Sequence, residues 1–150
     1  MTPDARVSDE RVLERCRTIL ATDPGSPPAL STAGLALVRL GRHAEARPLL
    51  ETLNDGGRCE PEALIALGLA RLHTGDLEGA ANLFSTLLTS DPNEPRALRW
   101  LADVEERRGR FDAALALYRQ LERRRDAPGG VQRFIAAKID EMERRIASGR

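Results

Sequence analysis

The stretch Leu40-Gly41-Arg42-His43-Ala44-Glu45-Ala46 decides the fold, because similar stretches follow it twice. Thirty-four residues later the chain reads Thr74-Gly75-Asp76-Leu77-Glu78-Gly79-Ala80, and after the same step it reads Arg108-Gly109-Arg110-Phe111-Asp112-Ala113-Ala114. In each stretch a Gly is followed five residues later by an Ala. A constant period of 34 residues indicates a stack of repeated structural units.

Each repeat has the pattern of two helices joined by a tight turn. A Gly just past the last turn of a helix can adopt the left-handed conformation that closes the helix and reverses the chain. Gly41, Gly75 and Gly109 therefore mark the turn inside each pair. The predicted pairs are 27–40 with 43–54, 61–74 with 77–90, and 95–108 with 111–125.

One unpaired helix is predicted at each end of the repeats. Ser8 is a good N-cap for a helix over 8–22, and a capping helix with one apolar stripe is expected over 129–147. The predicted organisation is therefore a disordered N-terminus, 1–7, followed by a single domain, 8–150. Within it the repeats span 27–60, 61–94 and 95–128.

Two glycines inside helices predict close helix packing. Gly34 and Gly68 occupy the same place in successive repeats, and each costs about 1 kcal/mol relative to Ala in a helix. The cost is explained if a neighbouring helix comes too close for a side chain, with Ala46 and Ala80 as the expected counterparts. Pro48, early in the second helix of its pair, is expected to bend that helix slightly.

Over residues 27–126 the sequence resembles the tetratricopeptide repeat family. In the second repeat the matching residues are Leu64, Leu67, Gly68, Gly75, Ala80, Phe84 and Pro92, and in the third they are Leu98, Leu101, Ala102, Gly109, Ala114 and Tyr118. The chain departs from the family pattern where the usual tyrosine of the first helix is Leu37, Arg71 or Glu105. The resemblance implies an all-α fold, a right-handed α-solenoid of helix-turn-helix hairpins with about eight helices and a C-terminal capping helix.

Overall charge favours neither a nucleic acid nor a membrane as partner. The 150 residues include 23 Lys and Arg and 23 Asp and Glu, so the formal net charge is zero. Two arginine clusters, 107–110 and 123–125, are interleaved with acidic residues rather than with aromatic ones. A solvated helical face is therefore the better interpretation of these clusters.

The residue types needed for catalysis do not occur in a useful arrangement. The sequence contains no nucleophile–histidine–carboxylate set, no glycine-rich phosphate loop and no metal-spaced cluster, so we expect no enzyme activity, no cofactor and no metal. Cys16 lies on an apolar stripe and Cys59 in a linker. Without a signal peptide or an 18-residue apolar run, the chain is expected to be a cytoplasmic protein. The leading hypothesis below takes it to be of bacterial type.

In this family the first helix of each repeat lines an inner, concave wall. The resemblance therefore predicts a groove with an apolar floor and a charged end anchored by Trp100. The predicted groove residues are Leu35, Val38, Ile65, Leu69, Leu72, Arg96, Arg99, Trp100 and Asp103. The alternative is that this apolar wall is core, covered by one of the protein's own ends. Places that hold a carboxylate clamp in some members carry Ser31, Leu35, Ala66 and Arg99 here, so that clamp is not expected.

The leading hypothesis is a non-catalytic adaptor or chaperone-like module that holds a peptide or helix of a partner protein in this groove. A narrower version is a chaperone of the type III secretion kind. The second hypothesis is a scaffold that self-associates through its end helices into homo-oligomers. The third is an accessory domain of a larger protein.

Overall fold

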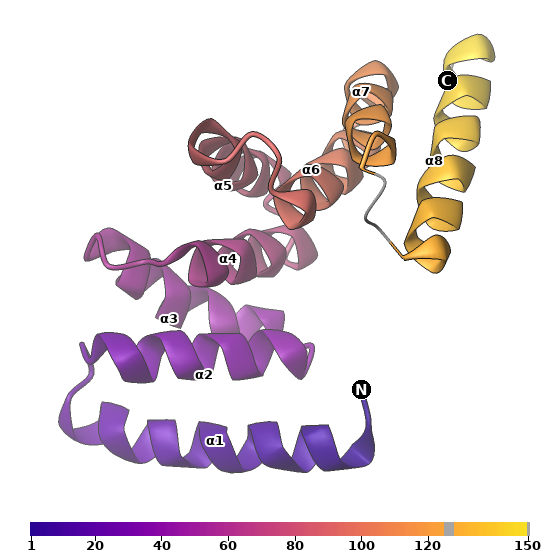
Figure 1. The fold of residues 1–150 in the computed structure, drawn as a ribbon. Helices are drawn as coiled ribbons and strands as arrows, with labels where there is room; N and C mark the ends of the chain where they lie inside the picture. Colours follow the sequence, from indigo (N-terminus) through magenta and orange to yellow (C-terminus); the bar gives the residue numbers. More distant parts are fainter. Residues whose placement is uncertain (125–127, 150) are drawn as a thin grey trace. The chain divides into compact units, whose positions relative to one another are not determined.

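The computed structural model describes residues 1–124 and 128–149, which form eight α-helices and no β-strand. In chain order the helices are α1 (Pro3–Thr22), α2 (Pro27–Arg39), α3 (His43–Asp55), α4 (Pro61–His73), α5 (Leu77–Ser90), α6 (Pro95–Arg107), α7 (Phe111–Glu122) and α8 (Gly129–Ala147) (Figure 1). The helices α2 to α6 and α8 agree with their predicted ranges to within one residue. Arg125 and the C-terminal end of the predicted helix 111–125 lie outside the described residues.

Two helix ends differ from the predicted ones. Helix α1 begins at Pro3 rather than at Ser8, because the Thr2 hydroxyl accepts a hydrogen bond from the Ala5 N–H and Pro3 is suited to the first helical turn. Residues 3–7 are thus helical, not disordered. Helix α7 ends at Glu122, where the N–H of Arg124 bonds to the carbonyl three residues back in a tightened last turn.

By its internal contacts the chain divides into two compact units, residues 1–79 and 80–150. The boundary lies inside α5. The first unit contains α1 to α4, and the second contains α6 to α8. The single domain over 8–150 stays a prediction.

The three predicted turn glycines close their helices as expected. Gly41, Gly75 and Gly109 have φ values of 75°, 88° and 75°, a conformation that costs Gly little. The N–H after each Gly donates to a carbonyl five residues back, joining Arg42 to Leu37, Asp76 to Arg71 and Arg110 to Glu105 at 2.8, 2.9 and 2.8 Å. This is the Schellman arrangement, repeated with the sequence period.

In the first unit, α2 packs against α1, α3 and α4, and consecutive helices run in opposite directions (Figure 1). A Cβ on Gly34 would lie 2.6 Å from Cγ of Leu50, so α3 leaves no room for a side chain there. The sequence predicted Ala46 as the counterpart of Gly34. The structure instead places Leu50, one turn further along α3, against it, while Ala46 is fully buried beside this contact.

An ion pair joins α1 to α2. Asp9 is buried, and its carboxylate accepts hydrogen bonds from Nε of Arg39 at 3.0 and 3.1 Å and from Nη2 at 2.6 Å. The Arg39 guanidinium lowers the pKa of Asp9 below its ordinary value, against the opposing effect of burial. This bidentate ion pair fixes α1 against the first repeat.

The second unit has its own core where α7 packs against α6 and α8. Its buried members are Leu98, Ala102, Ala114, Tyr118, Leu121, Ile135, Ile139 and Met142. Helix α8 contributes Ile135, Ile139 and Met142 to this cluster, so the C-terminal helix covers the third repeat as predicted (Figure 1).

Candidate partner-binding surface

Five of the predicted groove residues lie in the first unit, and they do not form one open floor. Ile65 and Leu72 of α4 are 5% and 2% exposed, which makes them core side chains. Leu35 and Val38 of α2 and Leu69 of α4 are half-buried. Of the five predicted groove residues in this unit, only these three therefore offer apolar surface that a partner could contact.

The other part of the predicted wall borders a hollow in the second unit, with a volume of about 190 Å³. Helix α6 forms one side of it and α8 the other. The lining residues are Pro95, Arg96, Arg99, Trp100, Leu121, Arg124, Val131, Phe134 and Ile135. We call this site the α6/α8 hollow. It contains three of the four groove residues predicted on α6.

Arg99 lies between two aromatic rings in this hollow. Its guanidinium carbon is 5.0 Å from the ring centre of Trp100 and 5.0 Å from that of Phe134. Such contacts hold a cation in place through the electron-rich faces of the rings. Within the described part of the chain, Arg99 makes no hydrogen bond to an oxygen and no ion pair. Its N–H donors therefore remain available to a ligand.

The two other arginines of the hollow are held at its rim. Nε of Arg96 donates to Oε1 of Glu94 at 3.1 Å, and Nη1 of Arg124 donates to the carbonyl oxygen of Asn93 at 2.6 Å. Burial would raise the pKa of Glu94, but the hydrogen bonds from Arg96 lower it below its ordinary value. Three of the residues lining the hollow are cationic, one of them paired with Glu94, and none is acidic, so an anion is favoured over a cation beside Arg99.

The fourth residue predicted on α6 lies apart. Asp103 does not line the hollow, and its carboxylate accepts a hydrogen bond from Nε of Arg107 one turn further along the same helix, at 3.1 Å. Of the charged residues predicted on this part of the wall, only Arg96 and Arg99 therefore line the hollow, and Glu94 pairs with Arg96 at its rim.

The sequence reasoning missed the contribution of α8. Val131 and Phe134 are 41% and 38% exposed, and both line the hollow. The repeat phase contained the signal, because residues 129–147 align with the first helix of a repeat and first helices line the wall. The predicted wall includes only the first helices of the three complete repeats.

A polar network holds α8 against α6 and α7. Nζ of Lys138 lies 2.8 Å from Oε1 of Glu106, and the Tyr118 hydroxyl donates to Oε2 of Glu106 at 3.2 Å. Arg119 of α7 also pairs with Glu143 of α8 at 2.7 Å. These contacts, together with the buried cluster, fix the helix that carries Phe134.

The remaining charged clusters are largely paired. Arg108 and Arg110 lie 2.9 and 3.6 Å from the buried carboxylate of Glu105. The described residues contain no group of three or more His, Cys, Asp or Glu side chains placed to hold a metal ion. None of the described helices has the length and apolar character needed to span a membrane.

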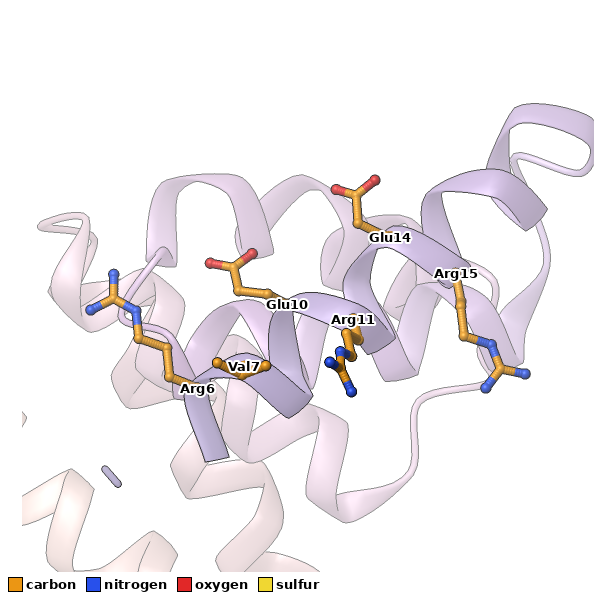
Figure 2. A pocket seen from close by; sticks show the side chains of 6 residues that line it. All are labelled: Arg6, Val7, Glu10, Arg11, Glu14 and Arg15. Atoms are coloured by element: carbon orange, nitrogen blue, oxygen red, sulfur yellow. The ribbon is translucent and has the colours of Figure 1, made fainter. Parts of the chain in front are cut away.

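A second, more open hollow lies on α1 alone. Figure 2 shows its lining side chains, of which only Val7 is apolar. The others are Arg6, Glu10, Arg11, Glu14 and Arg15. A single helix provides this whole surface, so it is an open helix face rather than an enclosed pocket.

Solved structures similar to this chain are bacterial repeat proteins. A MamA mutant shares 25% identity with a TM-score of 0.71 over 76% of this chain and 66% of its own, so the chain spans just under two thirds of MamA. The type III secretion translocator chaperone SycD of Yersinia enterocolitica shares 15% identity over 79% and 83% of the two chains, with a TM-score of 0.72. PcrH of Pseudomonas aeruginosa shares 19% identity over 79% and 92%, with a TM-score of 0.68. The latter two show a shared fold.

No curated protein matches the sequence at a significant level. The sequence profile of the tetratricopeptide repeat matches residues 31–95 and again residues 65–130. Together the two matches cover most of the chain and coincide with the helix pairs that the structure shows. The predicted all-α fold of helix-turn-helix repeats is confirmed, and the chain belongs to the tetratricopeptide repeat family.

Proposed function

We propose that the chain is a non-catalytic protein-interaction module that binds a short segment of a partner protein at the α6/α8 hollow. The observation that carries the proposal is the hollow itself, where two partly exposed aromatic rings contact the guanidinium of Arg99, which makes no hydrogen bond in the described structure. Aromatic residues and arginine are the side chains that dominate binding energy at protein interfaces.

An adaptor or chaperone-like role in the cytoplasm is the form of this function that we favour. Likeness to MamA and to secretion chaperones supports a repeat module of bacterial type. The finer role of a secretion chaperone rests on fold alone, since the identities to SycD and PcrH are 15% and 19%.

Self-association through the end helices is the second candidate, and the exposed Val7 and Ile19 of α1 are the observation in its favour. The chemistry of the two ends argues against it. Eleven of the exposed side chains of α1 and α8 are charged, and a heterologous contact between these faces would bury charges together with apolar area.

The test is affinity capture from a lysate of the source organism with four immobilised proteins. These are the wild type, Phe134→Ser, Arg99→Gln and, as a matched control, Arg133→Gln, which changes an exposed residue of α8 outside the α6/α8 hollow. Circular-dichroism melts establish that all four fold. We expect one or more proteins captured by the wild type and by Arg133→Gln to be lost from the two hollow variants. Equal capture by all four proteins would contradict the proposal.

A further inference from the structure

The size of the α6/α8 hollow limits what can enter it. A cavity of about 150 Å³ holds a benzene molecule. At about 190 Å³ the hollow has room for one large apolar or aromatic side chain, but not for a helix. A partner must therefore present a single bulky residue to it.

The walls indicate the same kind of residue. Trp100, Phe134 and Val131 give the hollow an apolar surface, and Phe134 and Val131 remain more than a third exposed. An aromatic side chain placed here would gain ring–ring contacts with Trp100 or Phe134 in addition to the burial of apolar area. Burial of one such side chain is the main source of affinity that the site offers.

The charge at the rim of the α6/α8 hollow indicates which chemical group of the partner lies next to the bulky residue. The guanidinium of Arg99 is fixed by two rings, yet none of its N–H groups donates to an oxygen of the described chain. A planar guanidinium binds a carboxylate through two parallel hydrogen bonds. No acidic residue lines the hollow, and Arg96, paired with Glu94, and Arg124 border the same rim, so an acidic group beside the aromatic residue is favoured over a basic one at Arg99.

We propose that the α6/α8 hollow recognises an acidic peptide segment in which an aromatic side chain is flanked by aspartate or glutamate. The aromatic ring enters the hollow against Trp100 and Phe134, and a flanking side-chain carboxylate pairs with Arg99. This inference rests on the proposed function and names the chemistry of its partner. Arg99 takes part in both contacts, because its guanidinium lies against the aromatic rings of the α6/α8 hollow and its N–H groups can donate hydrogen bonds to the carboxylate.

The only tryptophan of the chain, Trp100, lies in the hollow and supplies the readout. The probe is a blocked nonapeptide with one phenylalanine between two glutamates in a Gly/Ser background, acetylated and amidated at its ends. Three companion peptides carry alanine for phenylalanine, lysine for both glutamates, or a free C-terminal carboxylate with both glutamates replaced by serine. Each is titrated into the full chain while the emission of Trp100 is recorded.

We expect a saturable change with the acidic aromatic peptide and at least tenfold weaker binding of the three companions. Arg99→Gln and Phe134→Ser are expected to weaken binding of the acidic peptide at least tenfold, whereas Arg133→Gln leaves it unchanged. Added salt should weaken the wild-type binding, since an exposed part of the ion pair is screened.

Equal binding of the lysine peptide, preferential binding of the free-carboxylate peptide, or no saturable response at millimolar peptide overturns this inference. The proposed function survives these results if the capture experiment still shows a partner lost from the hollow variants. If capture is also insensitive to those variants, both proposals fail together.

Discussion

Lys138 of α8 places its Nζ 2.8 and 3.1 Å from the two carboxylate oxygens of Glu106 on α6, 32 positions earlier in the chain. Burial would lower the pKa of Lys138, but the Glu106 and Glu141 carboxylates raise it above its ordinary value, so the side chain is a cation. The Glu106 carboxylate also accepts a hydrogen bond from the Tyr118 hydroxyl. Burial raises the pKa of Tyr118 well above its usual range. The contact between Lys138 and Glu106 holds α8 against α6. It therefore contributes both to the stability of the second unit and to the position of Phe134 in the α6/α8 hollow.

Lys138→Met is the first test of that connection. It leaves Glu106 as a mostly buried carboxylate without its cation, and we expect the free energy of unfolding to fall by about 1–3 kcal/mol. Urea denaturation followed by circular dichroism measures the change. In the double variant with Glu106→Gln, the loss should be smaller than the sum of the two single losses, because both remove the same contact. Strict additivity would mean that Lys138 and Glu106 do not stabilise each other.

Asp9→Asn is expected to destabilise the first unit by about 1 kcal/mol, a modest value because the Arg39 side chain is 52% exposed. The pKa of Asp9 is lowered in the folded state, so its contribution is present above the ordinary value near 3.8 and is lost as the pH falls below it. Urea denaturation of the wild type and Asp9→Asn at pH 7 and pH 3 checks this. The difference between the two proteins should shrink at pH 3, and a constant difference would contradict the assignment.

His43 and His73 stack with their ring centres 4.1 Å apart and their planes 15° from parallel. Burial, with a smaller effect of His73, lowers the pKa of His43, so the folded state favours its neutral form. Stability linked to His43 is therefore complete above its ordinary pKa of 6.5 and decreases as the pH falls through the lowered value.

We expect His43→Phe, which keeps a stacked ring but cannot take up a proton, to lose less stability than the wild type between pH 7.5 and 5. Thermal melts across that range measure it, with the exposed Arg11→Gln as a control that should follow the wild type. Parallel pH profiles of the wild type and His43→Phe would show that His43 is not responsible.

Gly34→Ala tests the close contact of α2 with α3. Alanine favours the helix by about 1 kcal/mol, but its Cβ would displace Leu50 in a fully packed core, where overpacking costs about 1–3 kcal/mol. We expect a net destabilisation in urea titrations. In a Leu50→Ala background the clash is gone, and the same substitution should stabilise. Stabilisation in the wild-type background would contradict the tight packing at this position.

The repeat period was sufficient to predict most of the fold. Gly41, Gly75 and Gly109 end helices through local hydrogen bonds, so their places and the helix ends beside them can be recognised from short sequence patterns. Helix α1 begins five residues before the predicted start, because Thr2 and Pro3, an equally good cap, precede the apolar stripe that predicts the helix.

The site was predictable only in part, because it depends on contacts between distant residues. Trp100 and Arg99 were identified from their phase on a first helix. That Ile65 and Leu72 are buried depends on tertiary packing, and the same is true of the placement of Phe134 over Arg99. The pairing of Asp9 with Arg39 joins residues 30 positions apart and has no local signature.

Photo-crosslinking from position 134 tests the central claim most directly. A photoreactive phenylalanine analogue replaces Phe134 in one variant and the neighbouring exposed Arg133 in another, and both are irradiated in cells of the source organism. The account predicts a discrete adduct with a partner protein from position 134 that is absent from position 133 and is lost when Arg99→Gln is added. Identical adducts from both positions, or none from position 134, would contradict partner binding at the α6/α8 hollow.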